Sequence, residues 1–329
     1  MTTLRCGLIG LGQMGANHAR VAQDIGGLQL VGVADPAARD SSPQYPFPVF
    51  DDVEILLREG LDCAIIAVPT SAHESAAIQL AEAKVPTLIE KPISQDVSSA
   101  SRIVKTFAAK GVMGFVGHIE RFNPAIRELK SRLRQDVLGE IFQIQTRRQS
   151  AFPRRISDVG CVKDLGTHDI DLTMWVTDAG FDQIAAFTSH KAGRTEEDMV
   201  VVSGVLDNGL ITNHVVNWLS PLKERQIVIT GENGVLIGDT LTGSLQLHKN
   251  GQYDVDWEAV ARFKGVSEGD IIQFSYPKKE PLKAELEAFV SAISTGEKGD
   301  LATLEEGMKV IRVAEAIIES ASIQSVVRL

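Results

Sequence analysis

The sequence predicts an α/β protein in which a doubly wound parallel sheet is followed by an α+β domain with an open, mainly antiparallel sheet. Three observations carry this prediction. Strand-like apolar runs alternate with helical stretches early in the chain, a glycine-rich turn follows the first run, and hairpin signals separate later strand-like runs. At 329 residues the chain is long enough for two cores. We expect a first domain over residues 1–120, a second over 121–280 and closing helices over 281–329.

The glycine-rich turn connects the first strand, expected over residues 4–9, to the first helix. Gly10, Gly12 and Gly15 are spaced as G-x-G-x-x-G. The first glycine suits a tight turn, the second lets a pyrophosphate approach the backbone, and the third lets the helix pack close to the strand. The N–H groups at the helix start would hold the phosphates. The motif therefore predicts a Rossmann dinucleotide site, with a glycine-rich turn that holds no ligand as the alternative.

The second strand, expected over residues 28–35, ends in an acid. Asp35 lies 20 residues after Gly15, and a carboxylate at that place can accept hydrogen bonds from the adenosine ribose hydroxyls. A carboxylate would also repel a 2′-phosphate, so we predict NAD rather than NADP. Arg39 lies close in the sequence, and its positive charge would weaken this preference. The alternative is that Asp35 only begins the Asp35-Pro36 turn.

Further strands and helices complete the parallel sheet. They are expected over residues 51–59 (helix), 62–69 (strand), 71–83 (helix), 87–89 (strand), 97–110 (helix) and 112–116 (strand). Ligands of such a sheet bind beyond the carboxyl ends of its strands, where Asp35, Thr70 and Lys91 are expected. The predicted cofactor-binding set is Gly10, Gly12, Gln13, Met14, Gly15, Asp35, Val68, Thr70, His73, Glu90 and Lys91.

The pattern changes after about residue 120. Asn123-Pro124 is typical of a helix cap and first turn, and that helix is expected to end near Arg134. Asn208-Gly209 and Asn233-Gly234 are hairpin signals. Strands are expected over residues 140–148, 183–190, 199–206, 210–218, 226–230 and 244–248, with helices over 164–176, 283–295 and 303–321.

Charge and composition argue against several classes of partner. The net charge of −10 disfavours nucleic acid and anionic membrane surfaces. No apolar run reaches the roughly 18 residues of a membrane span, and the N-terminus lacks a signal-peptide layout. Cys6, Cys63 and Cys161 show neither a disulfide framework nor zinc-site spacing. We therefore expect a cytoplasmic protein without a metal site.

Two groups of side chains are candidates for acid–base chemistry. Lys91 follows a strand in Glu90-Lys91-Pro92, where a lysine can hydrogen-bond a substrate hydroxyl and bias its proton. A solvated loop lysine is the alternative. Asp164 and His168 would share a helix face, so that the carboxylate orients an imidazole suited to general base catalysis. The alternative is a structural His–Asp pair.

Arginines gather in the middle of the chain, and the group formed by Arg121, Arg147, Arg148, Arg154 and Arg155 spans 35 residues. Arginine forks suit phosphates, so this group in an acidic protein predicts an anionic substrate. A solvated helix and strand face is the alternative. The candidate substrate-binding residues are Arg121, Asn123, Arg154, Arg155, Asp164 and His168.

Taken together, the motif at residues 10–15, Glu90-Lys91-Pro92 and residues 164–168 resemble the glucose-fructose oxidoreductase/inositol dehydrogenase/MocA (Gfo/Idh/MocA) family along essentially the whole chain. The resemblance implies an NAD-binding Rossmann domain, an open-sheet domain for substrate and oligomerisation, and closing helices that return to the first domain. It also implies that Lys91 and His168 act on the reacting hydroxyl with Asp164 in support. A cis Lys91-Pro92 peptide and a homodimer or homotetramer are further implications.

Within that family, residues 117–124, 152–160 and 217–225 are similar to the sugar-nucleotide branch that includes UDP-N-acetylglucosamine 3-dehydrogenases. The similarity implies an NAD-dependent dehydrogenase of a secondary sugar hydroxyl, C3 of UDP-N-acetylglucosamine or of a related nucleotide sugar, and a diphosphate would account for the arginines. An inositol or free-sugar dehydrogenase is the second possibility. A non-catalytic dinucleotide-sensing regulator is the third, and the joint presence of Lys91, Asp164 and His168 argues against it. Whether Lys91 or His168 is the base stays open.

Overall fold

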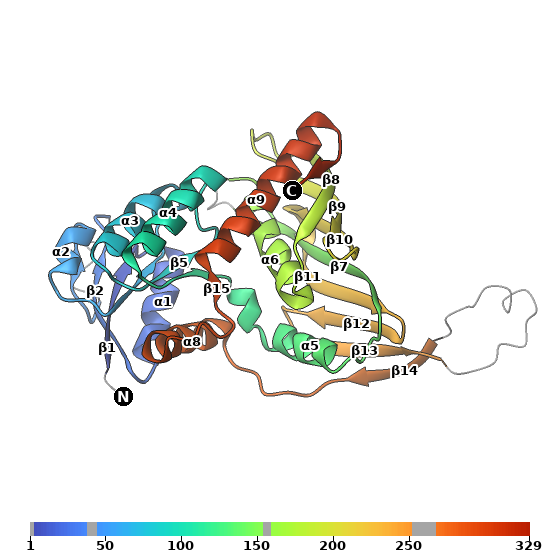
Figure 1. Ribbon diagram of the computed structural model, residues 1–329, viewed down its shortest axis with the longest axis horizontal. Coiled ribbons are helices and arrows are strands. Elements are labelled where there is room, and N and C mark those ends of the chain that lie inside the picture. Colours follow the sequence, from blue (N-terminus) through green and yellow to red (C-terminus); the bar gives the residue numbers. More distant parts are fainter. Residues whose placement is uncertain (1–2, 38–44, 154–158, 252–267) are drawn as a thin grey trace, which may run out of the picture. The chain divides into compact units, whose positions relative to one another are not determined.

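The computed structural model describes residues 3–37, 45–153, 159–251 and 268–329 (Figure 1). The chain divides into two compact units. The first comprises Met1–Phe122 and Lys279–Glu315, and the second comprises Asn123–Lys278 and Ala316–Leu329. Each unit therefore combines segments that lie far apart in the sequence, and helix α9 (Leu304–Ile323) contributes residues to both.

The first unit is built on a sheet with the strand order β15-β6-β5-β4-β1-β2-β3. All neighbouring strands pair in parallel except β15, which runs antiparallel to β6. Its strands are β1 (Leu4–Ile9), β2 (Leu28–Ala34), β3 (Val49–Phe50), β4 (Cys63–Ile66), β5 (Thr87–Glu90), β6 (Gly114–Gly117) and β15 (Ala302–Thr303). The order is that of a doubly wound dinucleotide-binding sheet, so the parallel, doubly wound sheet that the sequence predicts is confirmed.

Helices cover both faces of this sheet, which is why its strands are almost continuously apolar. One apolar cluster joins Leu8 to Val21 and Phe289, and the other joins Ile66 to Leu80. Helices α1 and α8 lie side by side in the first unit, and so do α3 and α4 (Figure 1). The helices of this unit are α1 (Gln13–Gln23), α2 (Val53–Leu57), η2 (Thr70–Ala72), α3 (His73–Glu82), α4 (Val97–Lys110), η3 (Ile119–Phe122) and α8 (Pro281–Thr295).

The second unit holds a sheet with the order β14-β13-β12-β11-β7-β10-β9-β8-β16. Every neighbouring pair is antiparallel except β10 with β7, so the predicted mainly antiparallel sheet is confirmed. Its strands are β7 (Ile141–Ala151), β8 (Phe181–Ser189), β9 (Met199–Leu206), β10 (Ile211–Asn217), β11 (Leu219–Gly231), β12 (Gly234–Asp239), β13 (Ser244–Asn250), β14 (Glu268–Gln273) and β16 (Val327–Arg328).

One face of this second sheet is packed and the other is open. Along β9, Val200 and Val202 are buried whereas Val201 between them is 38% exposed. Helix α5 (Pro124–Arg134) contacts β12 and β13 on the packed side, and α6 (Thr167–Thr177) contacts β7. Helix α5 begins as predicted, because the Asn123 side chain accepts a hydrogen bond from the Ala125 N–H and Pro124 occupies the first turn.

The helix expected over residues 164–176 differs from the prediction at its start. A π-helical turn, η4 (Val162–Gly166), leads into α6, so the helical segment begins two residues earlier than expected. Asp164 therefore lies in the π turn, and His168 lies in the α-helix that follows. A π turn is rare and often marks a functional site.

No helix within the described ranges combines the length and the apolarity that a membrane crossing needs. The same residues contain no group of three or more His, Cys, Asp or Glu side chains placed to hold a metal ion. The three cysteines are buried free thiols.

His214 on β10 is the clearest source of pH-dependent stability in the second unit. It is fully buried, its Nδ1 lies 2.8 Å from Thr146 Oγ1, and burial lowers its pKa to about 4. Between the unfolded value of 6.5 and about 4, the unfolded chain binds a proton that the folded chain does not. Stability from this residue is therefore present above pH 6.5 and is lost as the pH falls through that window.

We predict that His214→Leu removes a slope of about 1.4 kcal/mol per pH unit from the free energy of unfolding in that window. Urea unfolding at several pH values between neutrality and the lower end of the window measures the slope. The matched control is His190→Leu, at an exposed position of the same unit. An identical slope in wild type and His214→Leu would contradict the assignment.

Candidate functional site

The glycine-rich turn lies at the carboxyl end of β1, and its three glycines meet different structural requirements. Gly10 has a φ of +93°, and a Cβ there would lie 2.6 Å from the Ala67 carbonyl oxygen. A Cβ on Gly15 would overlap the carbonyl oxygen of Gly10. At Gly12, by contrast, an added Cβ would meet no atom within 4 Å. The first and third glycines therefore allow α1 to approach β1, and the second leaves the backbone open toward a ligand.

The start of α1 fits an anion. Gly12 is its N-cap, and no side chain of the described residues caps the helix. The first turn of α1 itself contains no acidic residue that would offset its N–H groups and the positive end of the helix dipole. The arrangement fits the pyrophosphate of a dinucleotide, with Gln13 and Met14 in the first turn.

Asp35, directly after β2, contacts the glycine-rich turn. Its Oδ2 accepts a hydrogen bond from the Leu11 N–H at 2.7 Å, and its Oδ1 accepts one from the Ala37 N–H at 2.8 Å. The second bond forms the turn that was the alternative explanation of this acid. The first bond brings the carboxylate to the turn between Gly10 and Gly12. Asp35 therefore forms the local turn and also contacts the glycine-rich turn. Its contact with a ribose stays a prediction.

Glu90 and Lys91 lie at the carboxyl end of β5. The buried Glu90 Oε1 lies 2.7 Å from His18 Nε2 on α1, and Glu90 Oε2 accepts the Lys91 N–H at 3.1 Å. Burial alone would raise the pKa of the Glu90 carboxyl, but the hydrogen bond and charge of His18, helped by Lys91 and His73, outweigh it and lower the pKa. The carboxylate therefore stays ionised and holds the backbone at Lys91. The Lys91-Pro92 peptide is cis, which confirms that implication of the family resemblance.

His73, at the start of α3, joins the segments that follow β4 and β5. Its Nδ1 lies 2.9 Å from the Pro92 carbonyl oxygen and its Nε2 lies 3.0 Å from the Val68 carbonyl oxygen. Burial lowers the pKa of His73, against the opposing effect of these carbonyl groups. Thr70 lies between Val68 and His73 in the sequence and begins η2. All the predicted cofactor-binding residues thus lie at or after the carboxyl ends of β1, β2, β4 and β5 in one sheet.

In the second unit, Asp164 is buried and His168 is half-buried. The prediction of one α-helix through both residues is corrected by the π turn at Asp164. A buried carboxylate binds the start of this helical segment, where Glu197 Oε1 accepts the Val162 N–H at 2.9 Å. Lys91 belongs to the first unit and Asp164 with His168 to the second. Their joint action on one hydroxyl stays a prediction.

The arginines of the group that predicts an anionic substrate differ in their surroundings. Arg121 is buried in the first unit, and its Nη1 lies 3.0 Å from Glu306 Oε2. Arg148 is buried in the second unit, with its Nε 2.8 Å from Asp169 Oδ1. Arg147 is exposed and lies 3.8 Å from a carboxylate oxygen of Glu224. The two remaining predicted residues, Arg154 and Arg155, lie outside the described residues.

Asn123 has a structural use in the second unit. Besides capping α5, its Nδ2 donates to the Thr240 carbonyl oxygen at 3.1 Å. A role in substrate binding stays a prediction for Arg121 and for Asn123.

Two residues near these sites were not predicted from the sequence, His18 and Glu197. His18 lies three residues after Gly15, so helix periodicity places both on the face of α1 that packs against the sheet. This spacing could have indicated from the sequence that His18 faces the sheet. Glu197 lies 35 residues from its partner Val162, and no local pattern connects them.

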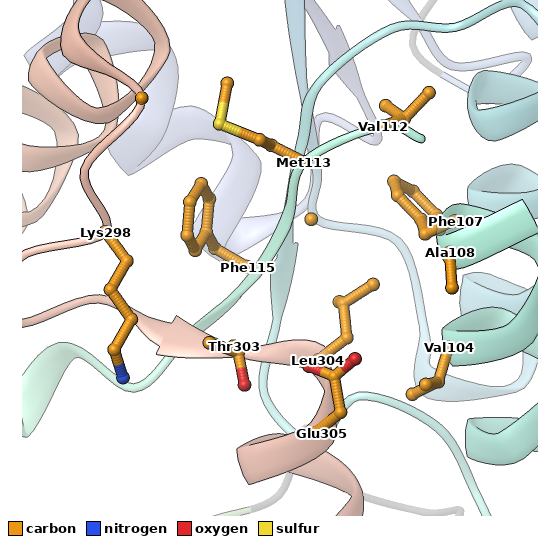
Figure 2. Close-up of a pocket in the computed structure, with 12 residues that line it drawn as sticks. Val104, Phe107, Ala108, Val112, Met113, Phe115, Lys298, Thr303, Leu304 and Glu305 are labelled. Atoms are coloured by element: carbon orange, nitrogen blue, oxygen red, sulfur yellow. The ribbon is translucent and has the colours of Figure 1, made fainter. Parts of the chain in front are cut away.

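The first unit also contains a cavity of about 240 Å³ that is separate from the predicted cofactor edge. Figure 2 shows apolar side chains from the end of α4 and the start of β6 around it, including Phe107, Val112 and Phe115. These residues lie at the amino end of β6, whereas Glu90 and Lys91 follow the carboxyl end of β5, which is parallel to it. At its rim, the Lys298 ammonium pairs with Glu306 Oε1 at 2.8 Å.

Comparisons with known proteins agree with this geometry. Residues 4–118 match the Gfo/Idh/MocA family model described as an oxidoreductase family with an NAD-binding Rossmann fold, and residues 130–329 match the C-terminal alpha/beta domain of the same family. The chain is 29% identical over 297 residues to a UDP-N-acetylglucosamine 3-dehydrogenase from Acidithiobacillus ferrooxidans, which covers 89% of this chain and 90% of that protein. It is 25% identical over 340 residues to an inositol 2-dehydrogenase from Saccharopolyspora erythraea, covering 97% and 94%.

Solved structures give the same result. The UDP-N-acetylglucosamine 3-dehydrogenase from Acidithiobacillus ferrooxidans superimposes with a TM-score of 0.84 at 26% identity, over 98% of this chain and 99% of that one. An Agrobacterium radiobacter oxidoreductase, solved with NAD+, L-tartaric acid and magnesium, shares the fold at a TM-score of 0.84 and 20% identity, over 99% and 98%.

We predict that Gly15→Ala weakens NAD binding by about tenfold or more, because its Cβ pushes α1 away from the carbonyl oxygen of Gly10 and from the phosphate position. Calorimetric titration with NAD measures the change. Gly26→Ala is the matched control, since an added Cβ there meets no atom within 4 Å. Unchanged NAD affinity in a folded Gly15→Ala protein would show that the turn does not hold the cofactor.

Proposed function

Because the chain belongs to the Gfo/Idh/MocA family of NAD-binding oxidoreductases, we propose that it oxidises a secondary hydroxyl of a nucleotide sugar, most specifically C3 of UDP-N-acetylglucosamine. The observation that carries the proposal is the similarity to UDP-N-acetylglucosamine 3-dehydrogenase through both units of the chain. The second unit matters most here, because we expect it to hold the substrate. The cofactor edge of the first unit would serve the oxidation of many hydroxyls equally well.

The residues of the first unit hold the cofactor and polarise the hydroxyl. The turn at Gly10–Gly12 and the start of α1 bind the pyrophosphate, and Asp35 accepts hydrogen bonds from the adenosine ribose. NAD, when bound, supplies the acceptor for the hydride that leaves the sugar carbon. The Lys91 ammonium donates a hydrogen bond to the reacting hydroxyl and makes its proton easier to remove. Glu90 keeps the Lys91 backbone in place through the bond to its N–H.

The residues of the second unit remove the proton and recognise the sugar. His168 accepts the hydroxyl proton, and the Asp164 carboxylate orients the imidazole and stabilises its charged form. Arg154 and Arg155 bind the diphosphate as bidentate guanidinium groups. Asn123 of the second unit and Arg121 of the first unit complete the proposed substrate set. A neutral polyol would need no such group of arginines.

The similarity to inositol 2-dehydrogenase over nearly the whole chain favours a second candidate, a dehydrogenase of inositol or of a free sugar. The two candidates differ in whether the substrate carries a diphosphate. A dinucleotide-sensing regulator without turnover differs from both, because it would bind NAD and reduce none of it with any sugar.

We predict NADH formation with UDP-N-acetylglucosamine at a kcat/KM at least about tenfold above that for inositol or glucose. Lys91→Ala and His168→Ala should each lower kcat by about 100-fold or more, which is far more than they lower NAD affinity, because each removes a proton-handling group. Absorbance of NADH and NAD titration measure the two quantities. Lys105→Ala, at an exposed position on α4, is the control and should keep wild-type turnover.

Each alternative result has a defined meaning. Preferred turnover of inositol would replace the nucleotide-sugar assignment with the polyol one. NAD binding without turnover of any sugar would favour the regulator. Full activity of either the Lys91 or the His168 variant would remove that residue from the mechanism.

We also propose that the chain forms a homodimer or homotetramer through the open face of the second sheet. Phe187 on β8 is 72% exposed and is the register partner of Val201 on β9, which pairs in turn with Val215 on β10. Ile211, also on β10, is 53% exposed. An apolar sheet face of this kind is usually covered in the functional assembly.

We predict that Val201→Lys dissociates the oligomer, because it places a charge in the middle of the apolar row. Size-exclusion chromatography with light scattering measures the mass. Leu241→Lys, at an exposed turn position after β12, is the control for adding a charge to an exposed leucine. An unchanged mass for Val201→Lys would place the subunit interface elsewhere.

A further inference from the structure

Glu197, two residues before β9, holds the start of the helical segment that carries Asp164 and His168. Its Oε1 accepts the Val162 N–H at 2.9 Å, and its backbone carbonyl oxygen accepts the Cys161 N–H at 3.0 Å. The side chain is buried, at 7% exposure. One residue thus satisfies two successive N–H groups at a helix start, where such groups otherwise have no partner in the helix.

Gly160 leaves the space that this carboxylate fills. A Cβ on Gly160 would overlap the Glu197 carboxylate, so any larger residue would displace it. The carbonyl oxygen of Gly160 accepts the Asp164 N–H at 3.1 Å. Gly160 therefore connects the carboxylate of Glu197 to the backbone of Asp164 through one contact and one hydrogen bond.

The segment around Glu197 is itself fixed. The next residue, Asp198, is fully buried, and its carbonyl oxygen accepts the Trp218 N–H at 2.9 Å. The Arg194 guanidinium carbon lies 5.1 Å from the Phe152 ring and 5.6 Å from the Trp218 ring. Phe152 and Trp218 also meet edge to face at 5.5 Å. Glu197 is thus held on a rigid support, which a residue needs if it is to position others.

The electrostatics at the helix start agree with this placement. A carboxylate stabilises the positive end of a helix, and here it occupies the place where an anionic ligand would otherwise bind. Burial, together with the nearby carboxylates of Glu197 and Asp198, raises the pKa of the Cys161 thiol well above its usual range. Cys161 therefore stays neutral and packs beside the Glu197 carboxylate.

We propose that Glu197 is a positioning residue for the oxidation reaction, because its carboxylate fixes the helix start from which Asp164 and His168 are presented to the substrate. The inference rests on the roles proposed above for Asp164 and His168. Glu197 touches no reacting atom. It acts through the backbone of residues 160–164.

Four variants test the clamp, by which we mean the hold of Glu197 on the N–H groups of Cys161 and Val162. Glu197→Ala should lower kcat by about tenfold or more, because a small displacement of a catalytic group is costly, while the affinity for NAD on the first unit stays unchanged. Glu197→Gln keeps an acceptor oxygen and the same shape, so it should retain kcat within about threefold. Gly160→Ala should reproduce the loss by displacing the carboxylate. The double variant Gly160→Ala/Glu197→Ala should be no worse than either single one, since the shortened side chain leaves room for the new Cβ.

The matched control is Glu319→Ala, which removes an exposed glutamate of the same unit and should keep wild-type kcat. The inference is overturned if folded Glu197→Ala keeps wild-type kcat. It is also overturned if the losses of the two single variants multiply in the double variant, because Gly160 and Glu197 would then act independently.

Amide hydrogen exchange separates this inference from the proposed function. In Glu197→Ala the amides of residues 161–168 should exchange faster than in wild type, and Glu197→Gln should restore most of their protection. This readout does not depend on turnover. Unchanged protection in Glu197→Ala overturns the clamp even if the enzyme is active, and faster exchange in a protein that oxidises no sugar keeps the clamp while the proposed function fails.

Discussion

The close approach of α1 to the end of β1 is the constraint on which the first unit depends. It requires Gly10 and Gly15, since a Cβ on Gly15 would overlap the Gly10 carbonyl oxygen. The same approach brings His18 on α1 to Glu90 on β5, and Glu90 in turn holds the N–H of Lys91. The glycines therefore do more than admit a phosphate. They also let α1 come close enough to the sheet for His18 to reach Glu90, which binds the backbone of the proposed catalytic Lys91.

Both units use a buried glutamate in the same way. Glu90 accepts the backbone N–H of Lys91, and Glu197 accepts the backbone N–H of Val162, two residues before Asp164. In each case the carboxylate binds the main chain of a proposed catalytic segment rather than its side chain. A bond to the main chain fixes the segment and leaves the catalytic side chain available to the substrate. Removing such a carboxylate leaves a buried N–H without its partner, which costs about 1–3 kcal/mol.

Local patterns predicted the elements whose signals are local. Strand β1, helix α4 and the Asn123 cap of α5 lie where the sequence places them, because an apolar run, a helical stretch and an Asn-Pro start are short-range features. Strand β12 was missed, since its glycines weaken a strand signal. Gly238 is needed there because a Cβ would lie 2.9 Å from Ile227, a contact set by the fold. The π turn over residues 162–166 was also missed, since an ordinary helix from residue 164 was expected there.

The arginines show how burial refines a prediction made from composition. Arg148 and Asp169 form a pair that is buried on both sides, and breaking such a pair costs about 3–5 kcal/mol. Arg121 is equally buried, but its partner Glu306 is 32% exposed, so this pair is not closed off on both sides. A diphosphate would have to compete with the buried Asp169 for Arg148, whereas the exposed Arg147 holds Glu224 only loosely at 3.8 Å. We therefore expect Arg148 to hold β7 against α6 rather than to meet the charge of a nucleotide sugar.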